Sequence, residues 1–144
     1  MKLIAHNHPD AQAPGGAQVL QLANNADLQA LADAGAFDGI ARIELVFPKF
    51  TDGRAFSQAL WLRRRHGFAG DVRATGDVLV DQLVQMARCG FSSAVLAAGV
   101  NPDAATAQFA RYSGGYYQGD VLHPQPRFAA SAVAPSVHPT VEIA

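Results

Sequence analysis

Apolar strand-like runs alternate with amphipathic helix-like runs through the middle of this chain, and this alternation is its strongest constraint on the fold. In chain order we expect strand 18–23, helix 26–34, strand 41–47, helix 53–66, strand 71–75, helix 77–89, strand 93–98 and helix 102–113. Such alternation is typical of parallel strands joined by right-handed crossovers. Four units are too few for a closed eight-stranded barrel, which needs about 200 residues or more. We therefore expect an α/β fold whose parallel sheet is half-barrel-like (a partial TIM-type barrel) or open.

A weak internal repeat marks the ends of the expected helices. A glycine follows each helix, and an aromatic residue follows one or two positions later: Gly35/Phe37, Gly67/Phe68, Gly90/Phe91 and Gly114/Tyr116. Glycine supplies the left-handed C-cap of a helix, and the apolar residue after it packs back on the last turn. The repeat therefore supports the expected helix ends.

Length and composition limit the class of protein. The chain has 144 residues and is 49% hydrophobic, which favours a single domain over 1–144, with a core of about 17–119 and irregular arms at 1–16 and 120–144. It has 11 Lys and Arg and 12 Asp and Glu, a formal net charge of −1, so the chain as a whole has no positive electrostatic field that would attract nucleic acid. No window approaches the roughly 18 apolar residues of a membrane span. The single cysteine suits a reducing cytoplasm, so we expect a cytoplasmic protein.

The segment FPKFTDGR, residues 47–54, carries more chemistry than a surface turn needs. It joins an expected strand to an expected helix, and ligands of parallel α/β sheets gather where strands end. Thr51 or Asp52 can cap the helix, while Lys49 and Arg54 add positive charge beside its N-terminus. We therefore expect a site here for a small oxyanion such as phosphate, sulfate, sulfite or carboxylate.

The following strand ends in a similar way. Arg73 and Thr75 share one of its faces, and Gly76 and Asp77 lead into the next expected helix. Asp77 is most simply the N-cap of that helix. If the two strands are neighbours, Glu44 and Arg73 can pair across the inner face, either to orient a ligand or to neutralise two charges. We expect both strand-to-helix corners to converge on one anion site formed by Lys49, Thr51, Gly53, Arg54, Arg73 and Gly76.

Other features favour structural roles. The pair His6 and His8 has metal-like spacing but lacks further ligands, so no metal site is predicted and a polar arm is expected. The basic run 63–66 is interpreted as a solvated helix end whose charges complement the helix dipole. Cys89 is interpreted as buried filler. No nucleotide motif, dithiol, haem or iron–sulfur ligand set is present, so no cofactor is predicted.

A longer block, residues 47–91, resembles a bacterial family called domain of unknown function 934. The shared motifs are FPKFTDGR, a G-x-[LV]-R-A-x-G-D-V-L pattern that appears here as GDVRATGDVL, and RCGF. The matched polar or glycine positions are Lys49, Asp52, Gly53, Arg54, Arg73, Gly76, Asp77 and Gln82. The resemblance implies a small protein encoded beside assimilatory sulfite reductase and often labelled a probable oxidoreductase.

Two functions remain open at this point. One is an auxiliary protein of assimilatory sulfur metabolism that carries the oxyanion site and, if it is an enzyme, uses Asp52 or Asp77 as acid/base and borrows a redox cofactor from sulfite reductase. The alternative is a non-catalytic module that docks on sulfite reductase or helps to assemble it. The free edges of an incomplete barrel also allow a homodimer.

Overall fold

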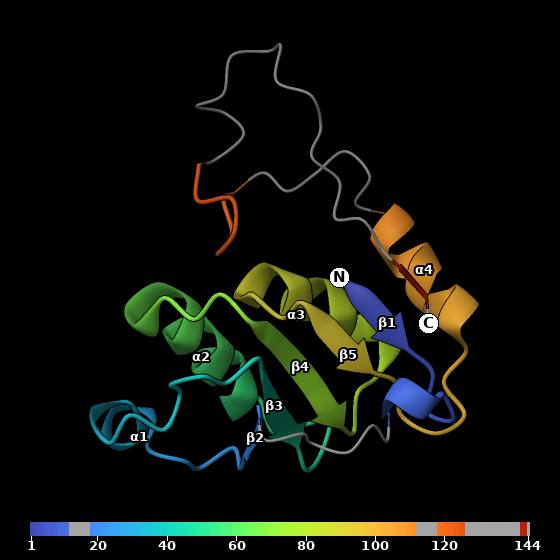
Figure 1. Ribbon diagram of the computed structural model, residues 1–144. Helices are drawn as coiled ribbons and strands as arrows, with labels where there is room; N and C mark the ends of the chain where they lie inside the picture. Colours follow the sequence, from blue (N-terminus) through green and yellow to red (C-terminus); the bar gives the residue numbers. More distant parts are fainter. Residues whose placement is uncertain (12–17, 112–117, 126–141, 144) are drawn as a thin grey trace.

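The computed structural model describes residues 1–11, 18–111, 118–125 and 142–143 (Figure 1). Its strands are β1 (Lys2–Ile4), β2 (Val19–Leu22), β3 (Arg42–Phe47), β4 (Asp71–Gly76), β5 (Ser93–Val95) and β6 (Glu142–Ile143). Its α-helices are α1 (Leu28–Asp33), α2 (Arg54–Trp61), α3 (Leu83–Cys89) and α4 (Pro102–Ala110), with short 3-10 helices η1 (Pro9–Ala11) and η3 (Val80–Gln82) and a π-helix η2 (Leu62–His66).

The strands form one parallel sheet in the order β2-β3-β4-β5-β1-β6. Helices connect the strands, and the sheet is not closed. The predicted α/β fold with an unclosed parallel sheet is therefore confirmed. The expected homodimer stays a prediction.

The strand β1 is the main element that the sequence analysis missed. It lies between β5 and β6, and its Leu3 and Ile4 are completely buried. The prediction that 1–16 form an irregular arm outside the core is therefore wrong for this strand. A run of three residues is too short to show the period-two pattern of a strand, so the residue pattern alone could not identify it.

One face of the sheet carries most of the apolar core. Ile43, Leu45 and Phe47 alternate along β3 and are completely buried, and Phe47 packs edge-to-face on Phe56 of α2 with ring centroids 5.2 Å apart. Figure 1 shows α2 and α3 side by side above β3 and β4. Of the intervening residues, Arg42 and Glu44 of β3 and Asp71, Arg73 and Thr75 of β4 are polar, whereas Val46 is apolar; by the alternation they face the opposite side.

The ends of η2, which continues α2, and of α3 agree with the glycine–aromatic repeat. Gly67 and Gly90 are left-handed C-caps with φ of 73° and 103°. The fourth pair of the repeat, Gly114/Tyr116, lies outside the described residues.

The basic run after α2 is not simply a solvated face. Arg64, Arg65 and His66 are exposed, as expected. Arg63, however, turns inward and donates hydrogen bonds to the carbonyl oxygens of three residues: Phe68 at 2.7 Å, Gly70 at 2.8 Å and Gly90 at 2.8 Å. Burial lowers the pKa of its guanidinium. Arg63 therefore connects the end of α2 to the end of α3.

None of the helices within the described ranges has the length and apolarity needed to cross a membrane.

Candidate functional site

The carboxyl ends of three neighbouring strands form the candidate site. Strands β2, β3 and β4 are parallel and adjacent, so the segments that follow Leu22, Phe47 and Gly76 emerge at one edge of the sheet. The segment 48–54, which ends with the first residue of α2, is called the β3–α2 loop below. Side chains from the segments after β2 and β4 bind this loop on both sides.

Asp52 organises the second half of the β3–α2 loop. Its carboxylate forms an ion pair with Arg54, with Oδ2 2.7 Å from Nη2 and Oδ1 3.0 Å from Nε. It also accepts hydrogen bonds from Asn24 Nδ2 at 2.6 Å and from the Arg54 amide at 3.3 Å. The hydrogen bond from Arg54 is the main reason that the pKa of Asp52 falls to about 2. Asp52 is therefore a carboxylate at neutral pH.

Asp77 and Gln82 hold the first half of the loop. Asp77 Oδ2 accepts a hydrogen bond from the Phe50 amide at 2.7 Å, and Gln82 Nε2 donates one to the Phe50 carbonyl at 2.9 Å. The expectation that Asp77 caps the next helix is wrong, because α3 begins only at Leu83 after the η3 turn. Gly76 and Asp77 instead form a turn against the Phe47 carbonyl.

These contacts fix the loop backbone and leave several of its side chains in solvent. Lys49, Phe50, Thr51 and Arg54 are exposed, and 39% of the surface of Phe50 is accessible. Burial of a phenylalanine on binding is strongly favourable, so an exposed ring on a fixed backbone suits a contact surface.

Arg73 does not join this loop. The residue is only 6% exposed. It donates to Ser93 Oγ at 3.1 Å and to the Asp10 carbonyl at 2.9 Å, and lies 3.4 Å from the Asp71 carboxylate. The expected anion site shared by Arg73, Lys49 and Arg54 is therefore not supported, because Arg73 makes these polar contacts with β4, β5 and η1, away from the loop.

Glu44 also differs from expectation in its partner. The register places Glu44 opposite Arg73, as the sequence analysis required for a pair. Glu44 instead pairs with Arg42, two residues earlier on the same strand, at 3.1 Å. Arg42–Glu44 on β3 and Arg73–Asp71 on β4 each pair two charges along one strand, so the expected pair between Glu44 and Arg73 does not form.

The remaining candidates have local structural contacts. His8 Nδ1 accepts a hydrogen bond from the Asp10 amide at 3.2 Å, and Asp10 pairs with Lys2 at 2.8 Å. Burial raises the pKa of the Cys89 thiol, which lies 3.3 Å from Gln85 Nε2 and is half-buried. Across the described residues, no three His, Cys, Asp or Glu side chains gather in a group suited to a metal.

The lowered pKa of Asp52 leads to a first testable prediction. Because Arg54 stabilises the ionised form, Asp52 stabilises the fold above its ordinary pKa of 3.8 and loses that contribution as the pH falls through about 2. We expect an NMR titration of its side-chain carboxyl carbon to show a midpoint near 2 in the wild type and a clearly higher one in Arg54→Ala. Arg64→Ala should leave the midpoint unchanged. Equal midpoints in the wild type and Arg54→Ala would contradict the ion pair.

Comparison with models of protein families identifies the family of this chain. A family described as "Bacterial protein of unknown function (DUF934)" matches over residues 19–128. This span includes the whole β3–α2 loop together with Asn24, Asp77 and Gln82. Searches of curated proteins and of solved structures returned no match.

Proposed function

The chain belongs to the bacterial DUF934 family, and from this premise we propose that it is a cytoplasmic accessory protein of sulfite reduction that docks on sulfite reductase without catalysing a reaction itself. The β3–α2 loop is the proposed contact surface. The observation that carries this proposal is the exposed Phe50 side chain on a backbone held at both its amide and its carbonyl.

The state of the two candidate acid/base residues favours docking over catalysis. A general acid or base works best when its pKa lies near the working pH, and the pKa of Asp52 is about 2. Asp77 accepts a hydrogen bond from the loop backbone and so serves the structure of the loop. Both carboxylates thereby support the contact surface.

The connection to sulfur metabolism has a separate basis. It rests on what the resemblance of residues 47–91 implies about the family, whereas the contact surface rests on geometry. The proposal therefore has two parts that can fail independently. The partner can be wrong while the loop still binds some other protein.

A binding measurement tests the docking surface. We expect isothermal titration of the protein with sulfite reductase from the same organism to give saturable binding. Phe50→Ala should weaken it at least about tenfold, because aromatic residues at the centre of an interface dominate its energy. Lys49→Glu should weaken binding too and reduce its salt dependence, since rim charges act mainly through long-range attraction.

Two control variants match these changes. Leu60 is 38% exposed on α2, close to the 39% of Phe50, so Leu60→Ala removes a similar exposed apolar group outside the loop. Arg64→Glu makes the same kind of charge reversal away from the loop. Both should bind like the wild type. Saturable binding that none of the loop variants weakens would place the contact elsewhere, and no binding at all would remove sulfite reductase as the partner.

A small oxyanion at the same loop is the second candidate function. Lys49 and Thr51 are exposed beside the start of α2, a geometry that suits an anion. Asp52 disfavours anion binding here, because its negative carboxylate already accepts the hydrogen bonds of the Arg54 amide and guanidinium. Titration with sulfite, sulfate and phosphate separates the candidates. Saturable shifts of loop amides that disappear in Lys49→Ala support the anion site, and their absence leaves docking alone.

A further inference from the structure

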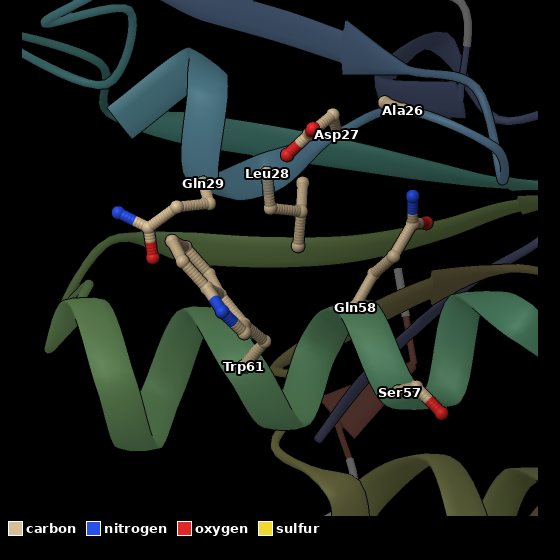
Figure 2. A pocket seen from close by; sticks show the side chains of 7 residues that line it. All are labelled: Ala26, Asp27, Leu28, Gln29, Ser57, Gln58 and Trp61. Carbon is tan, nitrogen blue, oxygen red and sulfur yellow. The ribbon is translucent and has the colours of Figure 1, made fainter. Parts of the chain in front are cut away.

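We propose that a cavity between α1 and α2 binds an organic cation, an ammonium or guanidinium group carried on an apolar chain. The cavity has a volume of about 310 Å³ and lies between the start of α1 and the side of α2 that carries Gln58 and Trp61 (Figure 2). Ala26, Leu28 and Trp61 form its apolar walls, and Asp27 and Gln58 are among its polar groups. It shares no residue with the β3–α2 loop, so the inference is independent of the proposed docking function.

Gln58 provides an unused hydrogen-bond acceptor in the wall of the cavity. The residue is only 6% exposed, and its side chain extends from α2 toward the segment that carries Ala26 and Asp27 (Figure 2). Its Nε2 donates to the Ala23 carbonyl at 2.9 Å, whereas its Oε1 is buried without a partner among the described residues. A buried acceptor without a donor is costly, so a ligand N–H group placed here would gain a favourable hydrogen bond.

The charge of the lining favours a cation. Asp27 is the N-cap of α1 and uses Oδ1 to accept from the Ala30 amide at 3.1 Å, while its carboxylate remains exposed. No lysine, arginine or histidine lines the cavity, so its only formal charge is negative. An acceptor and a carboxylate together are complementary to a group that donates several hydrogen bonds and carries positive charge.

Trp61 supplies the aromatic surface that such a ligand needs. Its indole is held by Phe37, with centroids 6.4 Å apart, and by the parallel ring of His66 at 6.1 Å. Cations are attracted to the face of an indole more strongly than to other aromatic rings. The indole, the Gln58 amide and the Asp27 carboxylate all line this cavity, and together they would suit an alkylammonium or alkylguanidinium group.

Trp61 also makes the test direct, because the chain contains one tryptophan. We expect butylguanidinium to change the Trp61 fluorescence saturably in the millimolar range at constant ionic strength. Butylurea has nearly the same shape and N–H groups but no charge, and should bind at least about fivefold more weakly, since charged hydrogen bonds are the stronger ones. Equal responses to both probes, or a change that sodium chloride alone reproduces, would overturn the inference.

Variants assign the response to the cavity. Asp27→Ser keeps a good N-cap residue while removing the charge, so it should weaken butylguanidinium binding about fivefold in a folded protein. Asp81→Asn removes an exposed carboxylate on η3 and should have no effect. Unchanged affinity in Asp27→Ser, with circular dichroism confirming the fold, would contradict the proposed site.

The source of the cation is the last arm of the experiment. A capped Gly-Arg-Gly peptide that binds more tightly than butylguanidinium indicates an arginine side chain of a partner protein. Tighter binding of butylguanidinium indicates a small-molecule ligand. Either result supports a cation site, whereas failure of both probes to bind would overturn it.

Discussion

Replacing Arg63 with alanine is expected to lower the free energy of unfolding by about 3 kcal/mol, because hydrogen bonds from a charged group to buried acceptors are among the strongest polar contacts. The guanidinium donates hydrogen bonds to the carbonyl oxygens of Phe68, Gly70 and Gly90. Phe68 and Gly70 lie in the segment that leads from η2 to β4, and Gly90 is the C-cap of α3. The substitution leaves all three carbonyl groups without this donor. It also removes the packing of the guanidinium over the Phe68 ring, 6.0 Å from its centroid.

Urea unfolding followed by circular dichroism measures this effect. Arg64→Ala is the matched control, because Arg64 is the next residue of the same basic run and is exposed. It should change stability by less than about 0.5 kcal/mol, as surface substitutions usually do. The loss of unfolding free energy in Arg63→Lys should lie between those of Arg63→Ala and Arg64→Ala, since an ammonium group cannot reproduce the planar fork of donors. Similar losses in Arg63→Ala and Arg64→Ala would mean that Arg63 does not join the two helix ends.

The second large effect is expected at Gly76, the last residue of β4. Its φ is 91°, and a Cβ at this position would fall against the carbonyl oxygen of Phe47 on the neighbouring strand. Gly76→Ala therefore combines an unfavourable left-handed backbone with a backbone clash, and we expect it to cost about 2–4 kcal/mol. The clash lies immediately before Asp77, so the variant should also loosen the hold on Phe50.

Gly99→Ala separates the two causes. Gly99 has a similar φ of 79°, but no atom lies within 4 Å of the place where its Cβ would be. This variant keeps the backbone penalty and lacks the clash, so it should cost about 1 kcal/mol. The difference between the two unfolding free energies measures the close approach of β3 and β4 at the loop. Equal losses of unfolding free energy in Gly76→Ala and Gly99→Ala would show that the close approach of Gly76 to Phe47 is unimportant.

The parallel α/β fold was predictable because its signal is repeated along the chain. The apolar alternation of β3 and the stripe of α2 each extend over enough residues to show their period. β1 has three residues and carries too little pattern, although it occupies an inner position in the sheet. Its place is determined by pairing with β5 and β6, which are distant in sequence.

The candidate site was predictable only in part, because residue types indicate chemistry but do not reveal partners. The sequence correctly placed residues 47–54 between a strand and a helix. It could not show that Asp77 binds the Phe50 amide rather than capping its own helix, since the two roles require the same side chain. Arg73 was misassigned for a related reason. Its partner Asp10 comes from the segment after β1, which was not expected in the fold.

The most direct test of the proposed docking surface compares the affinities of Phe50→Ala and Leu60→Ala for sulfite reductase. The two side chains are exposed to nearly the same extent, at 39% and 38%, and differ mainly in whether they lie on the β3–α2 loop. We expect Phe50→Ala to bind at least about tenfold more weakly than the wild type, and Leu60→Ala to bind equally well. Equal affinities for the two variants would contradict a contact through this loop.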